Sequence, residues 1–283
     1  MSPAPAHGAA HGAERVVHLV GAGPGAPDLL TLRAARLLAE ADIVFHDALV
    51  HPEVLALAAR ARKVAVGKRC GRLSTAQRFI NRQLVEAASR HRTVVRLKGG
   101  DPMLFGRAQE EIDALEAAGV RVEVVPGISA AFGAAAELSR SLTLRGASRS
   151  VAFVTPAIGP GEAAHDWARP AAAADTVALY MAGRRATEIA EGLIAQGVPA
   201  DRPAVLVENA TLPQQRVRAT RLSGLAQAAA GLGDGPALLL VGEVYRALLD
   251  AQAGAGPDRA WGHASEADTP PAMPPHLPVR AAA

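Results

Sequence analysis

Short runs of β-branched and other apolar residues alternate with stretches of helical periodicity in the first half of the chain. The runs that read as strands cover residues 16–20, 42–46, 63–66, 93–97 and 121–125. Strands that alternate with helices pair in parallel, because each helix returns the chain to the same edge of the sheet. The pattern therefore predicts a parallel sheet flanked by helices.

The intervening segments carry helix signals. We expect Asp28 to cap the first helix, Ser74 and Gln77 to form a capping box before the second, and Gly119 to end the third. The residues at helical spacing that we assign to the core are Leu30, Ala34, Leu37, Leu38 and Ala41, then Ile80, Leu84 and Ala88, then Ile112 and Leu115.

A second series of strands begins after residue 150. Its members cover residues 151–155, 176–181, 204–208, 216–220 and 237–241. Arg216, Arg218 and Thr220 alternate with Val217 and Ala219, which is typical of an antiparallel strand with one face in water. We therefore expect a second sheet and a hinge at residues 143–149.

The two ends of the chain, residues 1–14 and 253–283, are rich in Ala, Pro and Gly and lack periodic apolar residues, which predicts flexible tails. The fold class expected is α/β, with an N-terminal domain at 15–143 and a C-terminal domain at 144–252. Each domain is expected to hold a mainly parallel or mixed sheet flanked by helices.

The composition of the chain argues against three classes of function: membrane proteins, metal-binding proteins and nucleic-acid-binding proteins. No apolar run approaches the roughly 20 residues that span a bilayer, and no secretory signal opens the chain, so we expect a cytoplasmic protein without membrane contact. Cys70 is the single cysteine and has no histidine at metal-ligand spacing, so we expect no metal. The net charge is only +3, without a long Lys/Arg run, and aromatic residues are few, which disfavours nucleic-acid binding.

A glycine-rich turn follows the first strand. Gly21, Gly23 and Ala26 match the G-x-G-x-x-A spacing of dinucleotide-binding proteins, and acidic residues follow at near the expected distance. However, Pro24 and Pro27 delay the next helix, whereas that fingerprint needs its helix to begin within the glycines. A nicotinamide dinucleotide therefore ranks below another cofactor.

Two further glycine-bearing turns follow the fourth and fifth strands, at residues 98–102 and 126–129. Gly99 and Gly100 expose backbone groups, and Asp101 adds a carboxylate that attracts a cation or accepts hydrogen bonds from hydroxyls. The carboxyl ends of parallel strands lie at one edge of a sheet, where α/β proteins bind ligands. The three turns together predict a shared pocket.

The segments VGAGPGAPDLLT (20–31), VRLKGGDPMLFGRAQEE (95–111) and VPGISAA (125–131) closely resemble the tetrapyrrole methyltransferase family, and within it the uroporphyrinogen-III C-methyltransferases. The likeness runs from about Val16 to Leu249. It implies two α/β domains, usually in a homodimer, with S-adenosylmethionine in the cleft between them. It also implies methylation of uroporphyrinogen III at C2 and C7 to give precorrin-2, on the branch toward sirohaem and cobalamin.

The resemblance also implies roles for particular residues. The positions that match cofactor contacts are Pro24, Gly99, Gly100, Asp101, Leu104, Ser129, Ala130, Met181 and Ala210. Asp47 matches the catalytic base, and Lys68 matches a proton donor, although it could instead anchor substrate carboxylates. Uroporphyrinogen III carries eight carboxylates, so its site needs cations, for which Arg69 and Arg145 are the candidates.

Several positions depart from the family pattern, among them Ala108 and Gln109, which replace a glycine pair. Ala26 replaces a common Asp, Leu144 replaces a His, and Ala210 replaces a Gly whose backbone would tolerate positive φ. The alternatives left open are another precorrin C-methyltransferase of the same fold, a non-catalytic tetrapyrrole-binding protein and, third, an NAD-linked oxidoreductase.

Overall fold

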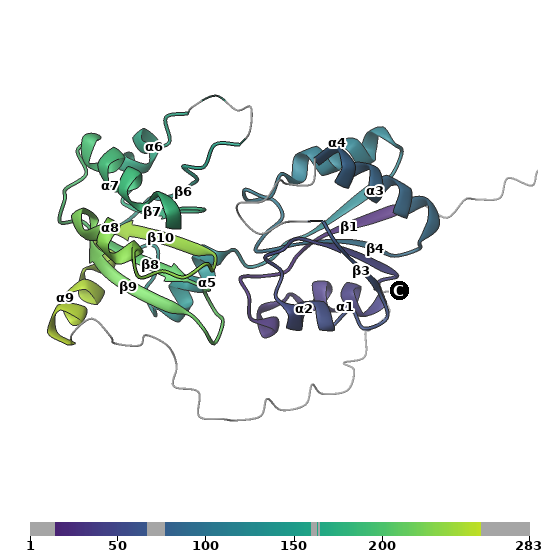
Figure 1. Ribbon diagram of the computed structural model, residues 1–283, viewed down its shortest axis with the longest axis horizontal. Coiled ribbons are helices and arrows are strands. Elements are labelled where there is room, and N and C mark those ends of the chain that lie inside the picture. The colour runs from purple at the N-terminus through teal and green to yellow at the C-terminus, as the bar shows by residue number, and fades with distance from the viewer. Residues whose placement is uncertain (1–14, 67–76, 160–162, 164, 256–283) are drawn as a thin grey trace, which may run out of the picture.

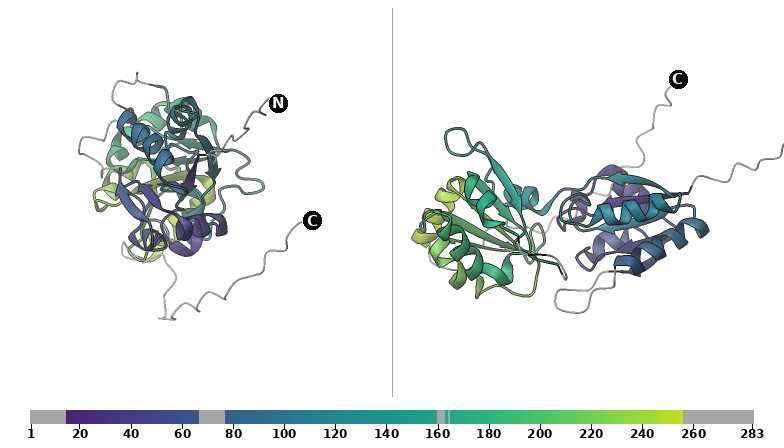
Figure 2. Two further views of the ribbon diagram at one scale, coloured as in Figure 1. Left: turned by 90° about the vertical axis from the view of Figure 1, so that its right-hand side faces the viewer. Right: turned by 90° about the horizontal axis from the view of Figure 1, so that it is seen from above.

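The computed structural model describes residues 15–66, 77–159, 163 and 165–255, which form two α/β halves side by side (Figures 1 and 2). The strands of the first half are β1 (Val16–Gly21), β2 (Ile43–His46), β3 (Arg62–Ala65), β4 (Val94–Lys98) and β5 (Arg121–Val125). They form a five-stranded sheet in the order β3-β2-β4-β1-β5. Every pairing is parallel, which confirms the prediction.

Helices cover both faces of this sheet (Figure 1). On one face lie α1 (Leu32–Glu40) and α2 (Pro52–Ala56), and on the other lie α3 (Gln77–Arg90) and α4 (Ala108–Ala117). Side chains alternate along a strand, so Val95 and Leu97 pack toward α1 and α2, whereas Val94 packs toward α3 and α4. The central strands are thus enclosed on both sides.

The start of the first helix differs from the prediction. A short 3₁₀ turn at Pro27–Leu29 precedes α1, and the Oγ1 of Thr31 accepts a hydrogen bond from the backbone N–H of Ala34 at 3.2 Å. The assignment of Asp28 as the cap was wrong, because the proline-containing turn places the helix start three residues later. Thr31 supplies the side-chain acceptor that the first N–H groups of the helix need.

The predicted start of α3 falls partly outside the described residues, whereas the predicted end of α4 is observed. Ser74 lies outside the described residues, so the capping box stays a prediction, while Ile80, Leu84 and Ala88 are buried as expected. Gly119 has φ +69° just after α4, which confirms the predicted helix end.

The second half holds a mixed sheet. Its strands are β6 (Val151–Val154), β7 (Thr176–Leu179), β8 (Pro203–Glu208), β9 (Arg216–Arg221) and β10 (Ala237–Gly242), in the order β6-β7-β10-β8-β9. The β6–β7 pair is parallel and the other pairs are antiparallel. Edge strand β9 buries Val217 and Ala219 and exposes Arg216, as its alternation predicted.

Helices again cover both faces of the second sheet. The core on one face includes residues of α6 (Ala168–Ala173), α7 (Ala186–Ala195) and α8 (Leu225–Ala229), and the core on the other includes residues of α5 (Ala130–Glu137) and α9 (Arg246–Ala255). Ala131 and Ala134 of α5 pack with Val205 and Leu240 of this sheet. By packing, α5 therefore belongs with the second half, although the expected hinge at 143–149 had placed it with the first, because apolar spacing does not reveal which sheet a helix covers.

The three glycine-bearing turns meet at the carboxyl edge of the first sheet. Gly23 and Gly100 exchange two backbone hydrogen bonds, with N···O distances of 3.2 and 2.8 Å. A Cβ on Gly21 would lie 2.6 Å from the Cα of Gly127, and a Cβ on Gly127 would overlap the carbonyl oxygen of Gly100. The predicted convergence is confirmed, and it depends on the absence of side chains at these positions.

Within the described residues, the helices are all too short or too polar to cross a bilayer. The same part of the chain has no group of three or more His, Cys, Asp or Glu side chains placed to hold a metal ion.

Substituting one of the contacting glycines tests this packing. We expect Gly127→Ala to lower the free energy of unfolding by about 2 kcal/mol or more, because the new methyl group overlaps rigid backbone rather than a flexible side chain. The matched control is Gly231→Ala, whose Cβ would lie 3.7 Å from its nearest neighbour and should change stability by less than about 1 kcal/mol. Urea denaturation measures both, and equal midpoints would contradict the prediction.

Candidate active site

The hydroxyl group of Tyr180, directly after β7, connects the two halves of the chain. It lies 2.7 Å from the Oγ of Ser129 and accepts a hydrogen bond from the backbone N–H of Ala131 at 3.2 Å. Burial raises the pKa of this hydroxyl, so it stays protonated and neutral. Tyr180 thus fixes the end of the third glycine-bearing turn against the second sheet.

The first glycine-bearing turn also contacts the second half. The backbone N–H of Ala26 donates to the Oγ1 of Thr211 at 3.1 Å. Pro24 packs so closely on α5 that a Cβ on Gly133 would lie 2.9 Å from its ring. The loop after β8 therefore completes a junction to which both sheets contribute.

Strained backbone is concentrated at this junction. Non-glycine residues with positive φ in the loops after β4, β7 and β8 are Phe105 (52°), Arg107 (54°), Met181 (56°), Asn209 (52°) and Thr211 (67°). Each such residue costs of the order of 1–3 kcal/mol and persists only where its surroundings impose it, a pattern typical of ligand-binding loops. The loop after β4 is one of the three glycine-bearing turns, and the loops after β7 and β8 carry two of the predicted cofactor contacts, Met181 and Ala210.

The carboxylate of Asp101 has a structural role in these turns. Its Oδ2 accepts from the backbone N–H of Gly127 at 2.9 Å, and its Oδ1 accepts from that of Met103 at 2.8 Å. The side chain therefore holds the second turn to the third. Each oxygen keeps a further lone pair, so the predicted ligand contact stays a prediction.

Large apolar side chains are exposed on the loops after β2, β4 and β7. They are Leu49, Met103, Phe105 and Met181, and 53% of Met181 is accessible. The ring of Phe105 lies 5.2 Å from that of Tyr180, across the junction. Exposed apolar groups beside convergent backbone groups form the kind of surface that binds a partly apolar small molecule.

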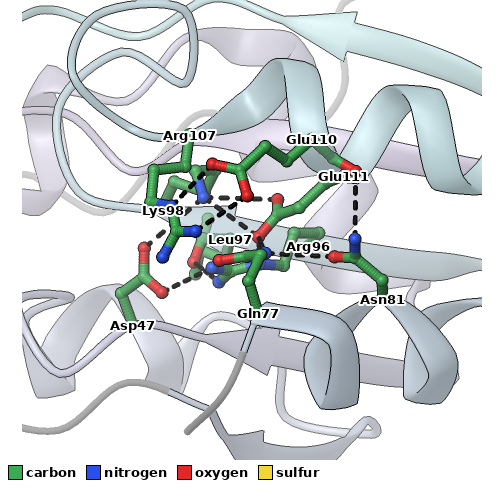
Figure 3. Close-up of polar contacts among 9 residues, drawn as sticks. All are labelled: Asp47, Gln77, Asn81, Arg96, Leu97, Lys98, Arg107, Glu110 and Glu111. Atoms are coloured by element: carbon green, nitrogen blue, oxygen red, sulfur yellow. Dashed lines mark hydrogen bonds and ion pairs between the residues drawn. The ribbon is translucent and has the colours of Figure 1, made fainter. Parts of the chain in front are cut away.

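Four charged side chains gather between β2, β4 and α4 (Figure 3). The guanidinium of Arg96 donates to the Oδ1 of Asp47 at 2.6 Å and to the Oε1 of Glu111 at 3.0 Å. The Nζ of Lys98 lies 3.2 Å from both oxygens of Glu111 and 3.9 Å from the Oδ2 of Asp47. We refer to Asp47, Arg96, Lys98 and Glu111 as the charged cluster.

Strand geometry explains how the charged cluster forms. Alternation places Arg96 and Lys98 on the face of β4 that is covered by α3 and α4. Asp47 follows β2, and its backbone N–H donates to the carbonyl of Leu97, which extends the parallel register by one residue. Burial, and secondarily the charge of Arg96, lower the pKa of Lys98.

Of the three cations predicted to bind the substrate or donate a proton, only Arg145 lies within the described residues. Lys68 and Arg69 lie outside the described residues. Arg145 is exposed in the turn between Leu144 and Ser148, with no ion pair to another described residue, so it is available to bind an anion. It makes no ion pair with the charged cluster, so its role as an anchor for substrate carboxylates stays a prediction.

Gly99 and Leu104 lie on the loop between β4 and α4, and Ala130 begins α5 directly after the third turn. Ala210 is buried in the core of the second half and does not itself have positive φ, which falls on its neighbours Asn209 and Thr211. The expected strain from Ala210 is therefore absent, because a methyl group at this position meets an ordinary backbone conformation.

Sequence reasoning missed Tyr180, Arg96 and Glu111 as site residues. A signal for Arg96 was present, because two cations at alternate positions of an otherwise apolar central strand have to find partners inside the protein. Nothing local identified Glu111 as that partner, since Glu110 beside it is exposed and equally acidic.

A cavity of about 570 Å³ lies elsewhere, along α5 and β6, with Phe132, Phe153 and Arg140 among its lining residues. None of its lining residues comes from the three glycine-bearing turns. One of these lining residues, Phe153, has its ring centroid 6.4 Å from that of Tyr180, so the cavity borders the junction on the side of the second half.

Comparison with known proteins agrees with this geometry. Residues 16–226 match the family model of tetrapyrrole (corrin/porphyrin) methylases. The chain is 44% identical to the uroporphyrinogen-III C-methyltransferase of Pseudomonas aeruginosa over 234 residues, which cover 82% of this chain and 95% of that protein. It also resembles the crystal structure of uroporphyrin-III C-methyltransferase from Thermus thermophilus complexed with S-adenyl homocysteine, with a TM-score of 0.73, 42% identity and coverage of 82% and 99%.

A third relative is longer. The chain is 46% identical to the siroheme synthase of Zymomonas mobilis over 227 residues, which cover 80% of this chain but 48% of that enzyme. The chain thus spans about half the length of the siroheme synthases that it matches. The match to the family model covers most of the chain, including all three glycine-bearing turns, and the resemblance inferred from those turns is confirmed: the protein belongs to the tetrapyrrole (corrin/porphyrin) methylase family.

Proposed function

We propose that this protein transfers methyl groups from S-adenosylmethionine to C2 and C7 of uroporphyrinogen III, giving precorrin-2. The observation that carries the proposal is the convergence of the three glycine-bearing turns beside Tyr180 and Met181 of the second half. The similarity to a uroporphyrinogen-III C-methyltransferase along 95% of its length supports the choice of substrate. Because the siroheme synthases are about twice as long, the proposal covers the methylation alone.

The junction fits an adenosine-containing sulfonium. Met181 and Phe105 offer apolar surface, and Gly99 and Gly100 allow close approach of a ligand to backbone groups. The remaining residues that we propose to line the cofactor site are Pro24, Asp101, Leu104, Ser129, Ala130 and Ala210. When bound, S-adenosylmethionine supplies a methyl group already activated by its sulfonium, so the transfer itself calls for no metal.

The protein's residues would then position the ring carbon and accept a proton. A carbon–carbon bond forms as the carbon–sulfur bond breaks, and the alkylated ring system afterwards releases a proton. Holding two reactants in attack geometry supplies roughly 7–11 kcal/mol of the barrier reduction. Asp47 is our proposed base, Lys68 the proposed proton donor, and Arg69 and Arg145 the proposed anchors for substrate carboxylates.

Two alternatives differ from the proposed function in the substrate or in the cofactor that the protein binds. Another precorrin C-methyltransferase would bind the same cofactor but act on a later corrinoid, and a non-catalytic tetrapyrrole-binding protein would not bind the cofactor at all. The Pro24 and Pro27 turn, which opens a 3₁₀ segment rather than a helix within the glycines, disfavours a nicotinamide dinucleotide.

Incubation with enzymatically generated uroporphyrinogen III and S-adenosylmethionine tests the proposal. We expect a product heavier by two methyl groups, detected by mass spectrometry, and S-adenosylhomocysteine in twofold molar ratio to it. Isothermal titration calorimetry with S-adenosylhomocysteine tests cofactor binding separately. Binding heat without methylation would favour a different tetrapyrrole substrate, whereas no heat and no methylation would reject the methyltransferase assignment.

Removing the charge of Asp47 tests its role as the base. We expect Asp47→Asn to reduce kcat by about 100-fold or more, because general-base catalysis contributes that much, while the Kd for S-adenosylhomocysteine stays within about threefold. The control variant is Asp113→Asn, which removes an exposed carboxylate from α4 and should leave kcat unchanged. Normal turnover by Asp47→Asn would remove this residue from the mechanism.

We also propose that the protein functions as a homodimer in the cytoplasm, as the resemblance implies. Light scattering coupled to size-exclusion chromatography is expected to give twice the chain mass of 29.1 kDa. A mass equal to one chain across the micromolar range would contradict the dimer.

A further inference from the structure

Burying the charged cluster in the protein interior carries a large desolvation cost. The exposed side-chain fractions are 2% for Arg96, 4% for Lys98 and 0% for Glu111. Removing such ions from water costs several kcal/mol each, and well-packed apolar side chains of similar volume often serve stability as well or better. Stability alone therefore gives a weak reason for three buried ions here.

The fourth member differs from the other three. Asp47 has 28% of its side chain exposed, so it is the member through which the cluster reaches solvent or a ligand. The other three form a frame behind it, in which Glu111 contacts both cations and both cations contact Asp47 (Figure 3). The two positive and two negative charges balance.

The directions of the hydrogen bonds distinguish the two oxygens of Asp47. The Nη2 of Arg96 donates to Oδ1 at 2.6 Å, while its Nε donates to Glu111 and its Nη1 to the carbonyl of Leu97. Its guanidinium plane is thereby fixed by three acceptors. Oδ2 lies 3.9 Å from Lys98, beyond hydrogen-bond distance, and accepts no hydrogen bond from another described residue. Among the described residues, Oδ1 is held by a short hydrogen bond, whereas Oδ2 has only the more distant ion pair with Lys98.

We propose that Glu111 is a positioning residue that acts through Arg96 and Lys98 to orient Asp47, so that Oδ2 is the oxygen that takes the proton from the methylated substrate. The inference rests on the proposed function, in which Asp47 is the base. Glu111 binds the ammonium of Lys98 with both oxygens and the Nε of Arg96 with one. Without that charge, both cations are left with Asp47 as their acidic partner, and Oδ2 becomes occupied.

The glutamine side chain of Gln77 supports the same frame from α3. Its Nε2 donates to the Oε1 of Glu111 at 3.1 Å and to the Oδ1 of Asn81 at 3.1 Å. Donors from two elements, β4 and α3, thus hold the carboxylate of Glu111 independently of Asp47. Several hydrogen bonds to one side chain fix its orientation, as a positioning role requires.

A double-variant cycle on kcat separates positioning from mere stability. Glu111→Gln keeps the side-chain volume and removes the charge, and we expect it to lower kcat by about tenfold or more while the Kd for S-adenosylhomocysteine changes by less than about threefold. In the Asp47→Asn background, the same substitution should lower kcat no further, because its effect passes through the carboxylate that is already absent. Glu116→Gln, an exposed carboxylate on the same helix, is the matched control and should not change kcat.

The outcomes are distinct. Wild-type kcat in Glu111→Gln, or an equal loss in both backgrounds, would overturn the positioning role while leaving the proposed function intact. Absence of methylation by the wild-type protein would instead overturn the proposed function and this inference with it. If circular dichroism shows Glu111→Gln to be unfolded, Arg96→Lys replaces it in the same cycle. This variant keeps the positive charge but loses the guanidinium that donates to three acceptors. We again expect a loss of kcat in the wild-type background and no further loss in the Asp47→Asn background.

Discussion

Close contact between three stretches of backbone sets the geometry of the candidate active site. Gly21, Gly100 and Gly127 follow or end different strands of the parallel sheet, and their main chains lie so close together that a Cβ on Gly21 or Gly127 would overlap backbone atoms. Because parallel strands end at the same edge, the contact brings the loops after β1, β4 and β5 into one surface. The side chain of Asp101 then joins the second loop to the third.

The second half of the chain uses this surface as its point of attachment. Tyr180 reaches Ser129 and Ala131, and Thr211 accepts from the backbone of Ala26, so loops after β7 and β8 meet the same glycine-bearing turns. Positive φ at non-glycine residues in these loops shows that their conformation is imposed by tertiary contacts rather than by local preference. Both halves therefore contribute to the proposed cofactor site, and the family match over residues 16–226 includes strands of both sheets.

The charged cluster extends the site along the sheet. A central parallel strand normally carries apolar residues on both faces, whereas β4 directs Arg96 and Lys98 into the layer beneath α3 and α4. Their partners come from β2 and α4, so a partly exposed carboxylate is held at the sheet edge where the glycine-bearing turns converge. Cofactor loops and proposed base are thereby placed by neighbouring strands of one sheet.

By itself, the sequence determined the alternation of strands and helices, the two unlike faces of β9, the helix end at Gly119 and the family, because periodicity and short motifs are local properties. Only the tertiary structure decided that Thr31 rather than Asp28 caps α1, that α5 covers the second sheet, and that Glu111 rather than Glu110 balances Arg96 and Lys98. These features depend on which surfaces meet. A helix with small apolar residues fits either sheet, and two adjacent glutamates are alike until packing buries one of them.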